Sequence, residues 1–155
     1  GVVKAVDIGT GAGLPGLPLA VALPRCNWLL LDRNQRKIRF LETVIAELGL
    51  KNAAAKVADL GRKPTEDLRS VADVVVSRAV DAPSGLLRLA QPLLKPGGSL
   101  ILMTSTASGG AGDVHAGSAE STALEPGFAV SEVRELSIPG LDRTHEVTII
   151  ERTCR

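Results

Sequence analysis

Aromatic side chains are scarce in this 155-residue chain, which has no Tyr, two Phe and one Trp. Proteins that hold single-stranded nucleic acids commonly stack the bases on exposed aromatic rings, so the composition argues against a stacking platform of that kind. A strong charge of one sign is also missing, because 18 basic and 17 acidic side chains leave a formal charge of +1. Proteins that depend on phosphate contacts usually carry a larger basic excess, so the overall charge gives no support for nucleic-acid binding.

Cysteine is rare, and Cys26 and Cys154 lie far apart without the spacing of metal ligands. We therefore expect two free thiols in the reducing cytoplasm, with a single disulfide as the alternative, and no bound metal. No apolar run is long enough to span a bilayer, and no segment resembles a secretion signal, so we expect no membrane contact. The length fits a single domain, residues 1–155, and leaves the oligomeric state open.

Apolar runs and turn signals alternate along the chain. Asn34 is expected to cap the second helix, and a flexible loop rich in Gly and Ser is expected at about residues 105–122. The strands are expected at 2–8, 28–31, 53–58, 71–76, 100–103, 128–136 and 145–152, and the helices at 14–23, 35–48 and 84–94. This alternation predicts an α/β fold, a Rossmann-like doubly wound and mainly parallel sheet that ends in an antiparallel pair.

A glycine-rich loop follows the first expected strand, at the edge of the sheet where open α/β folds bind ligands. Its glycines, Gly9, Gly11 and Gly13, allow a sharp turn and the close approach of a ligand. The pattern GxGxxG, from Gly11 to Gly16, would by itself suggest NAD and an oxidoreductase. A tight turn without any ligand is the third interpretation of the same residues.

Asp7 favours S-adenosylmethionine (SAM) over a dinucleotide. A carboxylate just before the loop can face the amino group of SAM, whereas it would repel the phosphates of NAD. Pro15 and Pro18 also favour SAM over a dinucleotide, because neither can donate an N–H to a pyrophosphate. No Tyr/Lys or His/Asp arrangement typical of an oxidoreductase is visible either.

Two further acids follow expected strands. Asp32 is placed to accept both hydroxyls of a ribose, a feature that NAD and SAM sites share, although it could also cap the next helix. Asp59, after the third strand, is placed to accept from the adenine amino group, and a solvated loop acid is the competing interpretation.

Several segments together resemble one family, the bacterial small-subunit ribosomal RNA guanine-N7 methyltransferases, also called glucose-inhibited division protein B. The segments are Asp7–Gly16, Leu31–Asp32, Lys37–Leu41, Glu47–Asn52, Val76–Val80, Pro92–Gly98 and Pro139–Asp142. The resemblance implies a class I methyltransferase that transfers a methyl group from SAM to N7 of a guanine in 16S ribosomal RNA. It also implies a catalytic position for Arg78, which could hold guanine O6 or a phosphate while N7 stays free. A surface Arg is the alternative.

The chain departs from the family pattern in three places. The helical segment that precedes the first strand in the family is missing, Thr104 stands where a Lys is usual, and His145 stands where an Arg is usual. These changes leave cofactor binding largely untouched and bear on RNA contact. A degenerate or truncated relative that binds SAM without methylating RNA is therefore the second hypothesis.

Overall fold

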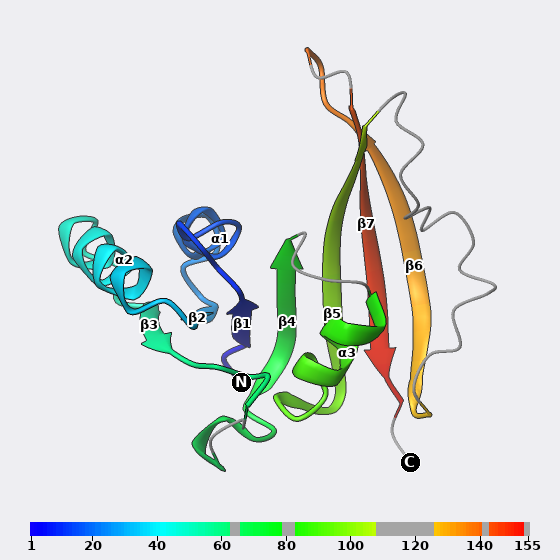
Figure 1. The fold of residues 1–155 in the computed structure, drawn as a ribbon, viewed down its shortest axis with the longest axis horizontal. Coiled ribbons are helices and arrows are strands. Elements are labelled where there is room, and N and C mark those ends of the chain that lie inside the picture. The colour runs from blue at the N-terminus through cyan, green and yellow to red at the C-terminus, as the bar shows by residue number, and fades with distance from the viewer. Residues whose placement is uncertain (63–65, 79–82, 108–125, 141–142, 154–155) are drawn as a thin grey trace.

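The structure is a computed structural model that describes residues 1–62, 66–78, 83–107, 126–140 and 143–153. The described residues form one seven-stranded sheet in the order β3-β2-β1-β4-β5-β7-β6 (Figure 1). The strands are β1 (Lys4–Ile8), β2 (Asn27–Asp32), β3 (Ala53–Val57), β4 (Ala72–Arg78), β5 (Leu94–Ala107), β6 (Phe128–Ser137) and β7 (Arg143–Arg152). The first five are parallel, and β7 and β6 complete the sheet as an antiparallel pair, so the predicted fold class is confirmed.

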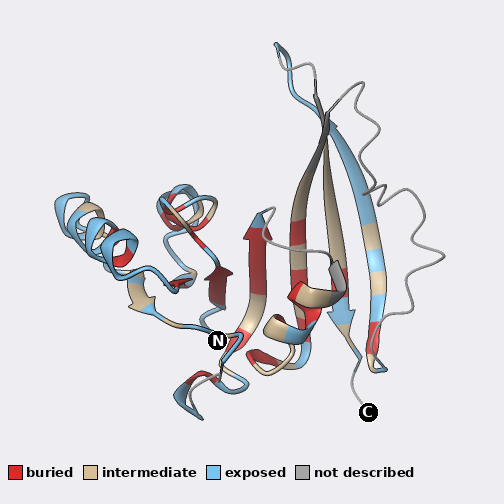
Figure 2. Ribbon diagram, viewed as in Figure 1, coloured by how far each residue is buried: buried red, intermediate tan, exposed pale blue. Residues whose placement is uncertain are grey.

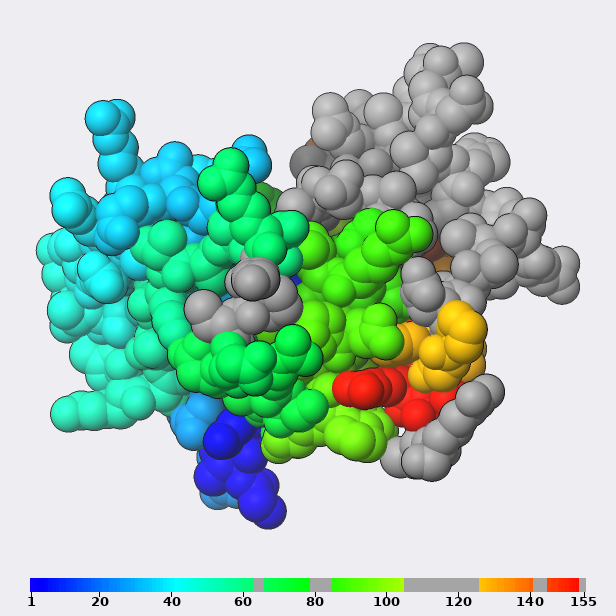
Figure 3. Space-filling model, turned by 60° about the horizontal axis from the view of Figure 1, so that its bottom comes forward, coloured from blue at the N-terminus to red at the C-terminus, as the bar shows by residue number. Residues whose placement is uncertain are grey.

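Helices cover the two faces of the sheet. They are α1 (Gly16–Ala22), α2 (Gln35–Glu47) and α3 (Pro83–Ala90), with a short 3₁₀ helix η1 (Glu66–Leu68) that the sequence analysis did not predict. Leu17 of α1 and Leu41 of α2 pack on one face together with Trp28 and Leu30 of β2. On the opposite face, α3 packs in a core cluster with residues of β1, β4 and β5. Figure 3 shows the surface of α3 between the η1 region and the ends of β6 and β7.

Burial is greatest in the middle of the sheet. Val75 of β4 and Leu30 of β2 have no exposed surface, whereas the outer strand β6 is exposed along most of its length (Figure 2). Continuous apolar runs in β1, β2 and β4 match strands that are covered on both faces. The apolar spacing in α2 places Ile38 and Leu41 in the core, and the side chain of Asn34 accepts from Arg36 N, so the predicted cap is confirmed.

Two predicted boundaries were wrong. The third helix was expected to run to Leu94, but α3 ends at Ala90, because Pro92 cannot continue a helical hydrogen-bond ladder. The strand that follows is longer than expected and runs from Leu94 to Ala107. The first three residues of the loop predicted at 105–122 therefore belong to β5, and residues 108–122 of it lie outside the described part of the chain.

Candidate cofactor site

The candidate site lies at the carboxyl ends of the parallel strands, where β1 has β2 on one side and β4 on the other. The chain leaves β1 through α1 and leaves β4 through α3, on opposite faces of the sheet, and a crevice opens at such a reversal. A cavity of about 580 Å³ lies here. Its lining residues are Ile8, Gly9, Leu31, Asp32, Arg33, Lys37, Ala58, Asp59, Leu60, Gly61, Arg78 and Leu89.

The structure brings four of the predicted site residues together around this cavity. They are Gly9 after β1, Asp32 at the end of β2, Asp59 after β3 and Arg78 at the end of β4. The other three do not line the cavity: Gly11 and Gly13 belong to the loop beside it, and Asp7 lies in β1 and binds that loop through Thr10. All seven residues lie at or next to the carboxyl ends of the parallel strands, and their binding roles remain a prediction.

Asp7 is fully buried, with none of its surface exposed. Its Oδ2 accepts hydrogen bonds from Thr10 Oγ1 at 2.6 Å and from the backbone N–H of Gly16 at 2.9 Å. Its Oδ1 is buried and has no hydrogen-bond partner among the described residues. Burial raises the pKa of Asp7 to about 6, although the two hydrogen bonds and the charge of Arg78 act in the opposite direction. A lone buried carboxylate oxygen is costly, and at a ligand-binding edge it suggests a functional acceptor.

The glycines of the loop serve different purposes. Gly9 and Gly11 have φ values of +66° and +60°, a left-handed conformation that side chains rarely adopt. Gly13 also has a positive φ, +95°, and both Gly13 and Gly16 are needed for space. A Cβ at Gly13 would lie 2.4 Å from Leu17 Cδ1, and one at Gly16 would lie 2.2 Å from Leu30 Cδ2. Gly13 thus lets the loop pack closely on α1, and its predicted contact with the ligand stays a prediction.

Asp32 is almost entirely buried and is held by the backbone. Its Oδ2 accepts from the N–H of Gly11 at 3.0 Å, and its Oδ1 accepts from the N–H of Asn34 at 2.8 Å. These bonds tie the end of β2 to the glycine loop. The helix cap that was weighed for Asp32 is provided by Asn34, so the carboxylate remains available at the cavity.

Asp59 and Arg78 are less constrained. Asp59 is about half exposed and forms an ion pair of 3.9 Å with Arg62, one turn further along the chain. Arg78 is exposed at the end of β4 and is the last β4 residue to pair with β5, opposite Met103. Thr104 is therefore the first residue of β5 beyond the end of β4, and it pairs with Glu146 of β7. His145 pairs with Ser105, one step further out.

Sequence reasoning missed three polar residues of this region. Thr10 binds Asp7, the buried Ser77 donates to the carbonyl of Ile8 at 3.0 Å, and Lys37 forms an ion pair with Asp32. The position of Thr10 within the glycine loop was a usable signal. Ser77 could not be assigned, because its partner Ile8 is 69 residues away and only the fold brings the two close. Lys37 lies five residues after Asp32, but the direction of its side chain depends on how α2 packs beside the end of β2.

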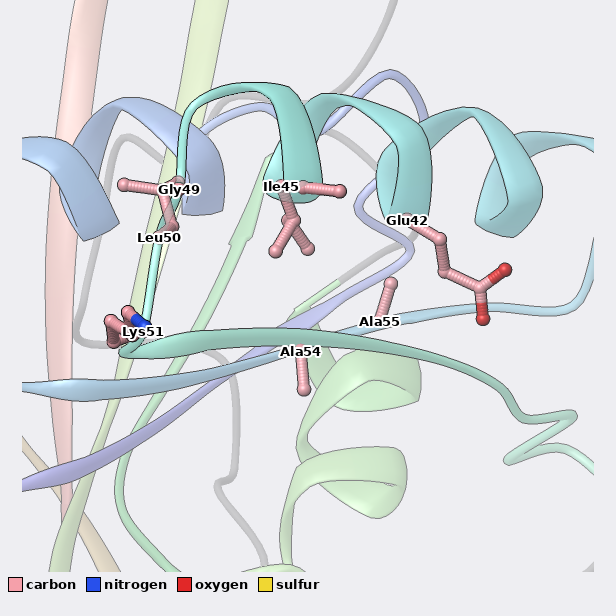
Figure 4. A pocket seen from close by; sticks show the side chains of 8 residues that line it. Glu42, Ile45, Gly49, Leu50, Lys51, Ala54 and Ala55 are labelled. Carbon is pink, nitrogen blue, oxygen red and sulfur yellow. The ribbon is translucent and has the colours of Figure 1, made fainter.

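Two other hollows lack converging polar groups. The first, about 450 Å³, lies between α2 and the edge strand β3, where Ile45 points towards the strand and Ala55 towards the helix (Figure 4). The second, about 600 Å³, is lined mainly by apolar side chains of α1, the turn after it and the strands β1, β2, β4 and β5. Ligand sites combine an apolar lining with a few placed polar groups, which favours the cavity at Asp32.

No group of residues suited to a metal ion occurs in the described part of the chain. Across the same residues, no helix is long and apolar enough to cross a membrane. Cys26, one of the two cysteines, is a free thiol.

Comparison with known proteins identifies relatives along most of the chain. The chain is 34% identical over 146 residues to "Ribosomal RNA small subunit methyltransferase G" of Xanthomonas oryzae pv. oryzae (strain MAFF 311018), covering 94% of this chain and 63% of the relative. It is 39% identical over 144 residues to the protein of the same name from Stenotrophomonas maltophilia (strain K279a), covering 92% and 62%. The chain thus spans less than two thirds of the length of these relatives.

Solved structures confirm the methyltransferase fold. The antibiotic-resistance methyltransferase Kmr superposes with a TM-score of 0.76 at 19% identity, covering 99% of this chain and 88% of Kmr. A putative transferase from Pyrococcus horikoshii gives a TM-score of 0.70 at 16% identity, covering 99% and 58%. The sequence model of the family described as "rRNA small subunit methyltransferase G" (GidB) matches residues 2–141. The chain therefore belongs to the GidB family of ribosomal RNA small subunit methyltransferases.

Proposed function

We propose that this chain binds SAM in the cavity at Asp32 and transfers its methyl group to N7 of a guanine in 16S ribosomal RNA. Family membership supports the reaction class. The observation that carries the proposal is the arrangement at the switch point. There Gly9, Asp32 and Asp59 line one cavity, and the buried Oδ1 of Asp7 beside it has no hydrogen-bond partner within the described ranges.

The residues present fit the chemical groups of SAM. Gly9 and Gly11 bring backbone rather than side chains to the ligand, and Asp7 would balance the ammonium of the methionine end. The proposed role of Gly13 is to let the loop pack tightly behind these contacts. Asp32 would accept the ribose hydroxyls, and Asp59 would accept from the adenine amino group.

When bound, SAM supplies an electrophilic methyl group on a sulfonium. Guanine N7 carries a free lone pair, so no base is needed to remove a proton before attack. The protein's task is then alignment and electrostatic support. Arg78, exposed at the end of β4 beside the cavity, would hold guanine O6 or a phosphate through its guanidinium and leave N7 accessible.

Titration calorimetry tests the cofactor. We expect micromolar binding of SAM and S-adenosylhomocysteine and no binding of NAD. Asp32→Ala should weaken S-adenosylhomocysteine by about 1–3 kcal/mol, because the hydroxyls lose their acceptor. Binding of NAD in place of SAM would support the oxidoreductase hypothesis and overturn this one.

Methyl transfer is tested with radiolabelled SAM on whole 30S subunits and on naked 16S RNA, which are the proposed partners. A cytoplasmic location is part of the same proposal. Arg78→Ala should abolish transfer while leaving the affinity for S-adenosylhomocysteine unchanged. Binding without transfer, even after Thr104→Lys restores the usual family residue, would support the degenerate relative instead.

A further inference from the structure

The Asp32 carboxylate still has acceptor positions that are not used by the protein backbone. Each oxygen of a carboxylate can accept about two hydrogen bonds. Oδ2 already accepts from Gly11 N, and Oδ1 already accepts from Asn34 N. One acceptor position therefore remains on each oxygen, which matches the two neighbouring hydroxyls of a ribose.

Lys37 approaches this carboxylate without using either remaining position. Its Nζ lies 3.5 Å from Asp32 Oδ2, which is an ion pair longer than an ordinary hydrogen bond. The side chain of Lys37 has 51% of its surface exposed and that of Asp32 has 7%, and both residues line the cavity. The lysine thus lies at the rim, and the carboxylate lies at the wall.

Charge explains why a cation at this position is useful. Asp32 and Asp59 line the same cavity, and Asp32 lies in a buried setting where an unbalanced charge is costly. Arg33 and Arg78 also line the cavity, but of the described residues only Lys37 has an ion pair with Asp32 within 4 Å. Its position in the first turn of α2, just after the Asn34 cap, fixes where the stem begins.

We propose that Lys37 is a positioning residue for ribose recognition, which acts through Asp32 rather than on the cofactor itself. Its ammonium holds Oδ2 in place and balances the carboxylate, so that one acceptor on each oxygen stays directed to the ribose diol. The inference rests on the proposed binding of SAM and adds a residue to that site.

The decisive experiment compares S-adenosylhomocysteine with its 2′-deoxy analogue by calorimetry. Lys37→Met should weaken S-adenosylhomocysteine about threefold to tenfold and the deoxy analogue less, so that discrimination between the two falls. Lys37→Arg should restore most of the affinity. In an Asp32→Asn background, Lys37→Met should have no further effect.

Arg36→Met is the matched control, because it removes the same charge from the same turn of α2 at a residue that does not line the cavity. Equal weakening by Arg36→Met, or equal loss for both ligands in Lys37→Met, would overturn the inference. A second readout needs no cofactor. Gly11 N donates to Asp32 Oδ2, so Lys37→Met should shift the Gly11 amide resonance and speed its hydrogen exchange, whereas Arg36→Met should not.

These two readouts separate the hypotheses. A wild-type chain that binds no S-adenosylhomocysteine would contradict the proposed function. An unchanged Gly11 amide in Lys37→Met would contradict the role of Lys37 whether or not SAM binds.

Discussion

The Asp7 carboxylate combines a cost in stability with a proposed use. Burial raises its pKa from 3.8 to about 6, so the folded state holds the proton more tightly than the unfolded state does. Stability from this group is therefore present at low pH and is lost as pH rises from about 4 to about 6, by roughly 3 kcal/mol in total. The ammonium of SAM would offset this penalty when it binds.

We predict that Asp7→Asn removes this pH dependence. Urea unfolding, followed by the fluorescence of Trp28, should show that the wild type loses about 2–3 kcal/mol relative to the variant between pH 4 and pH 7. Other titrating groups cancel in the difference. The variant should also bind S-adenosylhomocysteine more weakly at pH 7.5. A stability difference that does not change with pH would contradict the assignment.

Gly16 illustrates a close approach that only glycine allows. A Cβ there would lie 2.2 Å from Leu30 Cδ2 and 2.7 Å from Asp7 Oδ2. Gly16→Ala should therefore destabilise the chain by about 1–3 kcal/mol through overpacking. Gly61→Ala, whose Cβ would meet nothing closer than 3.5 Å, is the control and should be nearly neutral. Equal melting temperatures for the two variants would disprove the steric argument.

Between elements, Asn52 joins the start of β3 to the end of α1 and the turn that follows. Its Nδ2 donates to the carbonyl of Ala20 at 2.9 Å and to that of Cys26 at 3.0 Å. Asn52→Ala leaves both partly buried carbonyls without this donor and should lower the free energy of unfolding by about 1–2 kcal/mol. The exposed neighbour Lys51→Ala serves as the reference in urea denaturation. If both variants unfold at the same urea concentration, the hydrogen bonds of Asn52 do not stabilise the fold.

At the scale of the whole molecule, cofactor binding should appear as stability. A ligand present at 100 times its Kd raises the free energy of unfolding by about 2.7 kcal/mol when it binds only the folded state. For a domain of this size that corresponds to a rise in Tm of roughly 5–10 °C. S-adenosylhomocysteine should produce this shift in thermal scans, and NAD at the same concentration should not. A shift with NAD alone would point to a dinucleotide site.

Local patterns in the sequence determined much of this protein. Apolar runs and a 3.6-residue period predict the strands and helices, because they show which side chains are buried. The glycine loop after β1 predicts the ligand-binding edge, because glycine allows the backbone conformation that the turn there requires. The alternation of strands and helices predicts a mainly parallel sheet. Because the carboxyl ends of parallel strands meet at one edge, the positions of Gly9, Asp32, Asp59 and Arg78 there follow from the sequence, whereas the order of the strands does not.

Tertiary structure alone decided which side chains meet. Lys37 of α2 pairs with Asp32 of β2, and Asn52 before β3 donates to the carbonyl of Ala20 in α1. Packing likewise buries Asp7 and leaves its Oδ1 with no hydrogen-bond partner among the described residues. Such contacts leave no periodic signal in the chain, because they depend on distances set by the packing of helices on the sheet. The length of β5 was also decided by tertiary structure, since its backbone hydrogen bonds go to the neighbouring strands β4 and β7.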